Sequence, residues 1–119
     1  MTVKDGDSSS SKTTNPFINF NDPANPYRLK TYDNPGTILV TELLTTENYS
    51  TWTRSMRRAL RAKNKLGFID GTITKPNVTN PLFVLWERCN DMIVSWIQNS
   101  ISPQLKTSII FVDDASEIW

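Results

Sequence analysis

Residues 80–99 read NPLFVLWERCNDMIVSWIQN, and this stretch decides the fold. Asn80 followed by Pro81 is a helix-start signal, because Asn caps the free amides of a first turn and Pro suits the first helical position. At the helical spacing, several apolar side chains share an arc of ~140°, which is wider than packing against one neighbour requires. They are Leu85, Trp86, Cys89, Met92, Ile93, Trp96 and Ile97. The stretch therefore predicts the central helix of a helical core.

A second amphipathic helix is expected upstream, from about Tyr49 to Asn64, with Asn48 or Thr46 as its cap. Its apolar arc holds Tyr49, Trp52, Met56, Ala59 and Leu60. Its opposite arc is purely basic and holds Arg54, Arg57, Arg58, Arg61 and Lys65. Lys63 falls on the apolar side, so either its side chain reaches outward or the helix has frayed at this point.

Two further helix starts follow the central helix. Ser102 and Pro103 repeat the cap-plus-proline signal, and Leu105, Ile109 and Val112 keep helical spacing after them. Asp113 and Asp114 then mark the entrance to a fourth helix over residues 115–119. A helix this short cannot hold itself together, so we expect the sequence to be cut short there. The predicted fold is all-α, a small bundle of three helices plus the stump of a fourth.

Residues 1–34 differ in composition from the rest of the chain. They are rich in Ser, Thr, Asn and Pro and poor in aliphatic residues, so they bury too little surface to offset their ordering entropy. Their basic and acidic residues balance, and their four aromatics (Phe17, Phe20, Tyr27 and Tyr32) are suited to docking on the folded part or on a partner. We expect a disordered polar tail over 1–34 and a helical domain over 35–119, which begins at the turn Asn34-Pro35-Gly36 with an extended lead-in after it.

Composition excludes several classes of function. The chain has no His and one Cys, Cys89, so a Cys/His metal site, an internal disulfide and His-dependent nucleophilic catalysis all lack their residues. Glu87 and Asp91 lie one turn apart, but they belong to the polar face of a helix with no other catalytic group nearby. We predict no catalytic residue, no cofactor, no metal, no small-molecule substrate and no membrane segment, and a cytoplasmic protein.

The basic face of the upstream amphipathic helix needs negative charge nearby to offset its own repulsion. Arg54, Arg57, Arg58, Arg61 and Lys65 repel one another at helical spacing, and each close pair costs roughly 0.2–0.5 kcal/mol. Three sources of negative charge remain open for them. These are acids of the same chain such as Glu87, Asp91, Asp113 and Asp114, an acidic surface of another subunit, and the phosphates of RNA.

Several motifs occur together in a familiar order. They are Asn34-Pro35-Gly36 with Leu39-Val40, Asn48-Tyr49-x-x-Trp52, residues 65–71 (KLGFIDG), Trp86-x3-Asn90-Asp91-x4-Trp96-Ile97 and Glu117-Ile118-Trp119. Over roughly residues 32–119 this pattern closely resembles the N-terminal Gag domain of plant copia-type long-terminal-repeat retrotransposons. The Gag zinc knuckle and the protease motif have no counterpart here, because the cysteines, the histidine and an Asp-Thr-Gly or Asp-Ser-Gly triplet are missing.

The resemblance implies a capsid-like helical domain without catalysis, which assembles with other Gag subunits into a particle around element RNA. It also implies that Tyr49, Trp52, Trp86 and Trp96 are framework positions of the core. The alternative is a stand-alone helical module that binds nucleic acid through the Arg54–Lys65 face.

Overall fold

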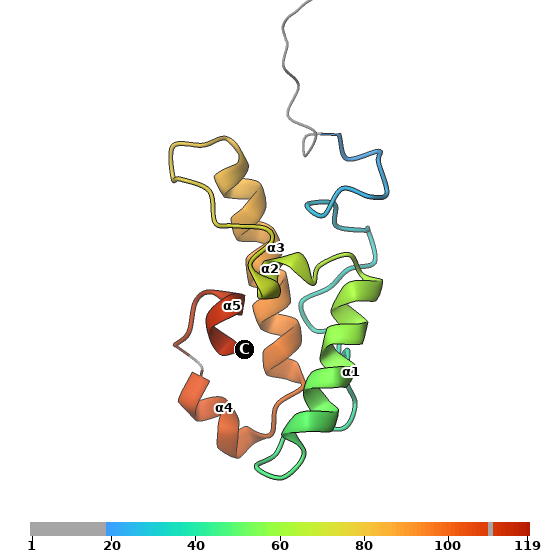
Figure 1. Cartoon of the computed structure of the whole chain (residues 1–119), viewed down its shortest axis with the longest axis vertical. Coiled ribbons are helices and arrows are strands. Elements are labelled where there is room, and N and C mark those ends of the chain that lie inside the picture. The colour runs from blue at the N-terminus through green and yellow to red at the C-terminus, as the bar shows by residue number, and fades with distance from the viewer. Residues whose placement is uncertain (1–18, 110) are drawn as a thin grey trace, which may run out of the picture.

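The computed structural model describes residues 19–109 and 111–119, and within them the chain is helical (Figure 1). The helices are α1 (Tyr49–Ala62), α2 (Gly67–Asp70), α3 (Leu82–Asn99), α4 (Pro103–Ile109) and α5 (Ala115–Ile118). The described residues form no sheet, and their one β-type pairing is an isolated bridge between Leu44 and Ile101. The predicted all-α class is confirmed.

Helix α3 runs through the middle of the molecule, with α1 on one side and α4 and α5 on the other (Figure 1). Its predicted apolar arc is the centre of the core: Cys89, Ile93, Trp96 and Ile97 are fully buried. The predicted cap is also present, because Asn80 Oδ1 accepts the amide of Leu82 at 2.9 Å. The buried residues of α3 share one arc and half-buried residues flank it on both sides, as the wide apolar arc predicts.

Helix α1 packs its apolar stripe of Trp52, Met56 and Leu60 into the same core. The Trp52 Nε1 donates to the carbonyl of Ser100 at 2.9 Å and so ties α1 to the end of α3. The helix ends at Ala62, two residues before the predicted end, and Asn64 takes a left-handed conformation with φ 57°. Asn is one of the few non-glycine residues that tolerate this conformation, which reverses the chain direction.

The short helix α5 is anchored on α3 by one side chain. Asn90 Nδ2 donates to the carbonyl of Asp113 at 2.8 Å, and Asn90 Oδ1 accepts the amide of Ala115 at 2.9 Å. Ala115 is fully buried, and the Trp119 ring lies 5.8 Å from the Trp52 ring between centroids. Four residues of helix are therefore held by tertiary contacts rather than by their own propensity.

Residues 19–34 contact the helices, although the composition assigned them to a disordered tail. Tyr27 is 5% exposed and packs edge-on against Phe68, with ring centroids 5.6 Å apart. The Trp96 Nε1 donates to the carbonyl of Asn34 at 2.8 Å. These contacts come from side chains far along the sequence, which a local composition does not register. Residues 1–18, the remainder of the predicted tail, lie outside the described residues.

Candidate basic interaction surfaces

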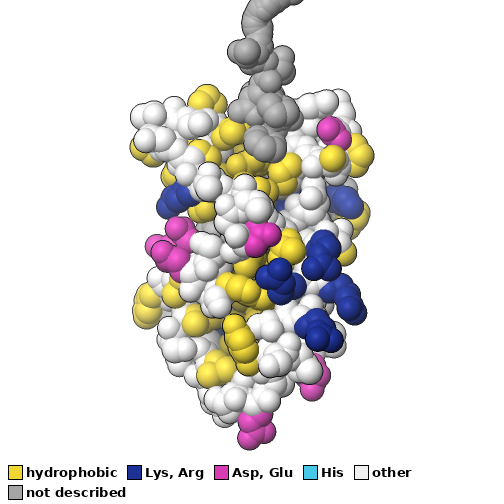
Figure 2. All heavy atoms as spheres, in the orientation of Figure 1, with side chains coloured by type: hydrophobic (Ala, Val, Ile, Leu, Met, Phe, Trp, Pro, Cys, Tyr) yellow, Lys and Arg dark blue, Asp and Glu magenta, His cyan; other side chains and the backbone are white. Residues whose placement is uncertain are grey.

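Four of the five predicted basic residues share one exposed edge of α1. Arg54, Arg58 and Arg61 are exposed and Arg57 is half-buried. Together with Ser50 and Thr53 they line a shallow groove of about 440 Å³, which we call the α1 basic face. Figure 2 shows Lys and Arg side chains gathered along this edge of the molecule.

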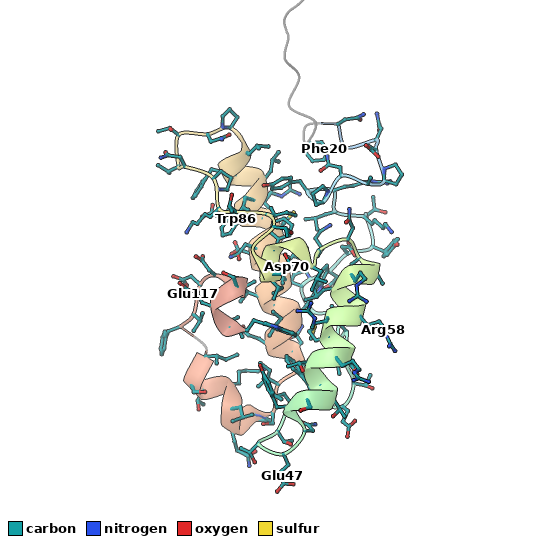
Figure 3. The ribbon with its side chains drawn as sticks, viewed as in Figure 1. Phe20, Glu47, Arg58, Asp70, Trp86 and Glu117 are labelled. Atoms are coloured by element: carbon teal, nitrogen blue, oxygen red, sulfur yellow. The ribbon has the colours of Figure 1, made fainter. Side chains whose placement is uncertain are left out.

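No carboxylate of the described residues forms an ion pair with this face, and Asp114 pairs instead with Lys75 at 3.6 Å. The exposed Asp70 interacts with the face through charge alone: hydrogen bonds from Thr72 lower its pKa, and the charge of Arg57 adds to this effect. Figure 3 places Arg58 and Glu117 at opposite edges of the molecule, with Asp70 between them.

Lys65 is not part of this face, so its prediction as an exposed contact residue is wrong. It is 2% exposed, and its Nζ donates to the carbonyls of Arg28 at 2.7 Å and Lys63 at 3.3 Å. The reason is the turn at Asn64, beyond which the helical spacing no longer applies. Burial lowers the pKa of Lys65, because its charged form has lost most of its water.

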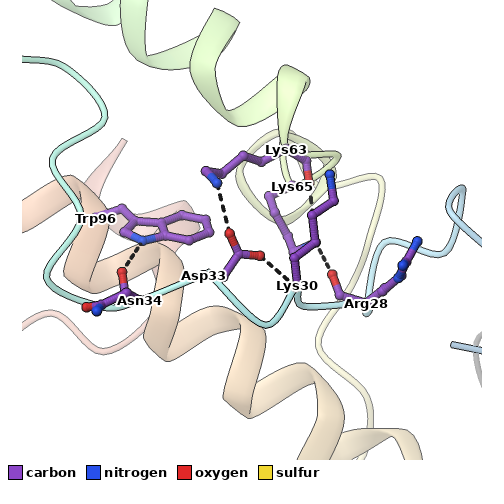
Figure 4. Close-up of polar contacts among 7 residues, drawn as sticks. All are labelled: Arg28, Lys30, Asp33, Asn34, Lys63, Lys65 and Trp96. Atoms are coloured by element: carbon purple, nitrogen blue, oxygen red, sulfur yellow. Dashed lines mark hydrogen bonds and ion pairs between the residues drawn. The ribbon is translucent and has the colours of Figure 1, made fainter.

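Lys63 and Asp33 form a partly buried ion pair between the end of α1 and the N-terminal segment (Figure 4). Lys63 Nζ lies 2.8 Å from Asp33 Oδ1 and 5.2 Å from the ring centroid of Trp96. Asp33 Oδ2 also accepts the amide of Lys30. Burial raises the pKa of Asp33, but these hydrogen bonds and the nearby lysine charges outweigh burial and hold it below its usual value.

A second basic surface, which the sequence analysis missed, lies between residues 20–32 and the first half of α3. We call it the cationic groove; it has a volume of about 490 Å³. Its lining includes the cations Arg28, Lys30 and Arg88, the aromatics Phe20, Tyr27 and Tyr32, and Leu29, Thr31 and Leu85. This groove was missed in the sequence analysis because residues 1–34 contain equal numbers of basic and acidic residues. A charge count does not show that the acidic side chains of the described residues lie outside the groove. The signal that was available is the interleaving of aromatics with Arg28 and Lys30.

Three of the four expected framework residues lie in the core. Trp52, Trp86 and Trp96 are at most 6% exposed, whereas Tyr49 is 56% exposed. The prediction that Tyr49 is buried is wrong, because it is the first residue of α1 and its ring lies at the edge of the bundle. Cys89 is buried too, and burial raises the pKa of its thiol to about 11, which makes the thiolate scarce at neutral pH.

Neither a metal site nor a membrane helix occurs in the part of the chain that the structure describes. No three His, Cys, Asp or Glu side chains converge there as a metal ion would require. None of the described helices combines the length and apolar character that a membrane crossing needs.

Comparison with known proteins supports the family resemblance. Residues 30–77 match the family described as Gag-polypeptide of LTR copia-type. The chain is 28% identical over 85 residues to the retrovirus-related Pol polyprotein from transposon RE1 of Arabidopsis thaliana, an alignment that covers 64% of this chain and 6% of that protein. The corresponding polyprotein from transposon RE2 gives the same figures. No solved structure matches. The chain spans a small part of these relatives, and its predicted resemblance to copia-type Gag is confirmed.

Proposed function

We propose that this Gag-like chain of the copia type is a structural and assembly domain, which catalyses no reaction and contributes to cytoplasmic particles around element RNA. The family match supports the general role. The observation that carries the assembly role is that the α1 basic face lies at the edge of the molecule opposite Glu117, as the positions of Arg58 and Glu117 show (Figure 3).

The charges of the two edges are available for contacts with other molecules. Asp113 and Glu117 are exposed in and beside α5, and Asp91 is exposed on α3. The arginines repel one another and have no intrachain carboxylate partner in the described residues, so the face gains most from an anionic surface brought from outside. Arginine is suited to this role because its planar guanidinium forms bidentate hydrogen bonds with carboxylates.

A second copy of the chain supplies such a surface. When the basic edge of one molecule meets the acidic edge of the next, the contact is heterologous, and the pair as a whole keeps one free basic edge and one free acidic edge. Contacts of this kind extend into rings or open filaments, depending on the rotation between neighbours. This is the geometry that a particle-forming subunit needs.

Nucleic acid is the second candidate for the same face, because phosphates also satisfy arginine forks. The two partners separate by salt dependence and by the role of the acidic edge. An RNA contact weakens steeply with salt and is indifferent to Asp113 and Glu117, whereas a subunit contact requires both edges.

Charge reversal of each edge tests the proposal. Sedimentation of the wild-type chain at low salt is expected to show oligomers that grow with concentration. Arg58→Glu with Arg61→Glu cancels the positive charge of the α1 basic face, and Asp113→Arg with Glu117→Arg makes the opposite edge basic as well. Each double variant is expected to be monomeric alone, and an equimolar mixture of the two is expected to oligomerise.

A control pair carries an equal reversal elsewhere. Glu42→Arg with Glu47→Arg changes two exposed carboxylates before α1 and is expected to leave assembly intact. If the wild-type chain stays monomeric, and the arginine reversal instead abolishes salt-sensitive binding of an RNA oligonucleotide, the assembly role fails and the nucleic-acid role replaces it.

A further inference from the structure

We propose that the cationic groove binds a nucleoside phosphate, with the phosphate between Arg28, Lys30 and Arg88 and the base against the exposed aromatic side chains. This goes beyond the assembly role, because it concerns a different surface and a ligand of defined chemistry. The groove volume of about 490 Å³ lies in the range of small-molecule sites.

The electrostatics of the groove favour an anion. Three cationic side chains line it, and no carboxylate of residues 19–109 or 111–119 does. The acids nearest in sequence are engaged elsewhere: Asp33 binds Lys63 Nζ and the amide of Lys30, and Asp22 Oδ1 accepts the amide of Ala24 at 2.9 Å. In Figure 4 the Arg28 side chain extends away from the Asp33 cluster, so its guanidinium is not drawn into that ion pair.

The remaining lining favours a flat, partly apolar group attached to that anion. Tyr32 is 68% exposed and Phe20 is 40% exposed, whereas Leu29 and Leu85 provide half-buried apolar surface. Aromatic side chains beside cations form the stacking platforms on which nucleobases bind. Lys30 Nζ lies 5.8 Å from the ring centroid of Tyr32, so a cation and a stacking surface are adjacent. Inorganic phosphate would leave this aromatic surface unused.

The wall of the groove is held in place before a ligand arrives. Tyr27 is buried against Phe68 directly before Arg28, and the buried Lys65 Nζ donates to the Arg28 carbonyl. Arg88 is fixed by its position on α3, which is the most buried element of the core. Cationic side chains on an ordered backbone lose less conformational entropy when a ligand binds than those on a flexible segment.

Calorimetric titration of the full 119-residue chain tests the proposal with four probes: uridine 5′-monophosphate, adenosine 5′-monophosphate, uridine and inorganic phosphate. Both nucleotides are expected to bind at least tenfold more tightly than uridine and phosphate, since each of those offers half of the recognised groups. Lys30→Ala with Arg88→Ala is expected to weaken nucleotide binding at least tenfold, and Tyr32→Ala to weaken it severalfold while leaving phosphate binding unchanged.

The matched control is Arg54→Ala with Arg58→Ala, which removes two exposed cations from the α1 basic face and is expected to leave nucleotide affinity unchanged. The groove variants in turn are expected to retain assembly, so failure of this proposal is distinguishable from failure of the assembly role. Displacement of bound nucleotide by a uridine oligonucleotide would assign the ligand to an RNA strand, and lack of displacement to a free nucleotide. Equal affinity for nucleotide, nucleoside and phosphate, or undiminished binding by the Lys30/Arg88 variant, would overturn the proposal.

Discussion

The three buried tryptophans differ in the hydrogen bonding of one atom, the indole Nε1. In Trp52 this nitrogen donates to the carbonyl of Ser100 at 2.9 Å, and in Trp96 it donates to the carbonyl of Asn34 at 2.8 Å. In Trp86 it is buried and has no acceptor among the residues that the structure describes. A buried donor without an acceptor costs free energy, so the same ring contributes differently at the three positions.

Replacement by phenylalanine separates these contributions. Trp52→Phe and Trp96→Phe each remove one hydrogen bond to a carbonyl that keeps a backbone amide as its second donor, whereas Trp86→Phe removes an unsatisfied donor. All three lose ring volume, and we expect the first two to cost about 1–3 kcal/mol more than Trp86→Phe in free energy of unfolding. Urea denaturation followed by circular dichroism measures the difference. Three equal losses would show that these hydrogen bonds contribute nothing.

Asp33 makes stability depend on pH at the acid end. Its folded-state pKa is lowered by the contacts with Lys63 and Lys30, so the unfolded chain binds the proton more readily than the native chain does. The stability from this carboxylate is therefore present above its ordinary pKa of 3.8 and is lost as pH falls through the lower folded value. We expect Asp33→Asn to cost about 1–3 kcal/mol at pH 7 and much less near pH 2.

Unfolding by denaturant at both pH values checks this. Asp91→Asn, the same change at an exposed position of α3, is expected to shift stability by less than about 0.5 kcal/mol at either pH. If the two variants behaved alike, the link between Asp33 and Lys63 would carry no stability.

At the residue scale, helical spacing predicted the burial of Trp52, Trp86 and Trp96 because each lies well inside its helix. It failed for Tyr49 and Lys65, which lie at and beyond the ends of α1. At such positions the local turn and tertiary neighbours decide where the side chain points. Helical periodicity of 3.6 residues therefore does not predict its burial.

At the element scale, α3 was predictable because its cap, proline and apolar arc agree. Helix α2 was not, since its four residues, Gly67–Asp70, are too few to show periodicity. The position of α5 also needed the structure, because one side chain of α3, Asn90, satisfies both the carbonyl of Asp113 and the amide of Ala115.

Asn90→Ala should release α5 from α3. The substitution removes the hydrogen-bond partner of both the Asp113 carbonyl and the Ala115 amide. Ala115 is fully buried, so water does not readily replace the lost partner of its amide. We expect the amides of residues 115–118 to exchange at least tenfold faster, while those of residues 92–96 in the middle of α3 keep their protection. Hydrogen exchange followed by mass spectrometry measures both segments. Unchanged exchange at α5 would mean that its apolar contacts suffice to hold it.

At the scale of the whole molecule, the site was less predictable than the fold. The α1 basic face followed from one helix, but the cationic groove combines Arg28 and Lys30 with Arg88, more than fifty residues away along the chain. Sequence composition treats residues 25–34 as a polar segment, whereas the fold uses their carbonyls as acceptors for side chains of the core, including Trp96 and Lys65.

The folded unit is accordingly expected to begin near Asn25 rather than at residue 35. Two deletions locate this boundary: removal of residues 1–24 and removal of residues 1–33. The difference between them is the contribution of residues 25–33, which hold Tyr27, the Arg28 carbonyl that accepts from Lys65, and Asp33. Loss of a buried aromatic alone costs ~3–5 kcal/mol.

In a domain of this size each kcal/mol lowers the melting temperature by about 4–8 °C, so we expect the longer deletion to melt at least about 10 °C below the shorter one. Tyr27→Ala in the full chain should reproduce much of this drop, whereas Tyr32→Ala, at a position 68% exposed, should not. Thermal denaturation followed by circular dichroism compares all four proteins. Equal melting temperatures for the two deletions would restore the boundary at residue 35, because Lys65 would then have lost the Arg28 carbonyl, and Lys63 its ion pair with Asp33, at no cost.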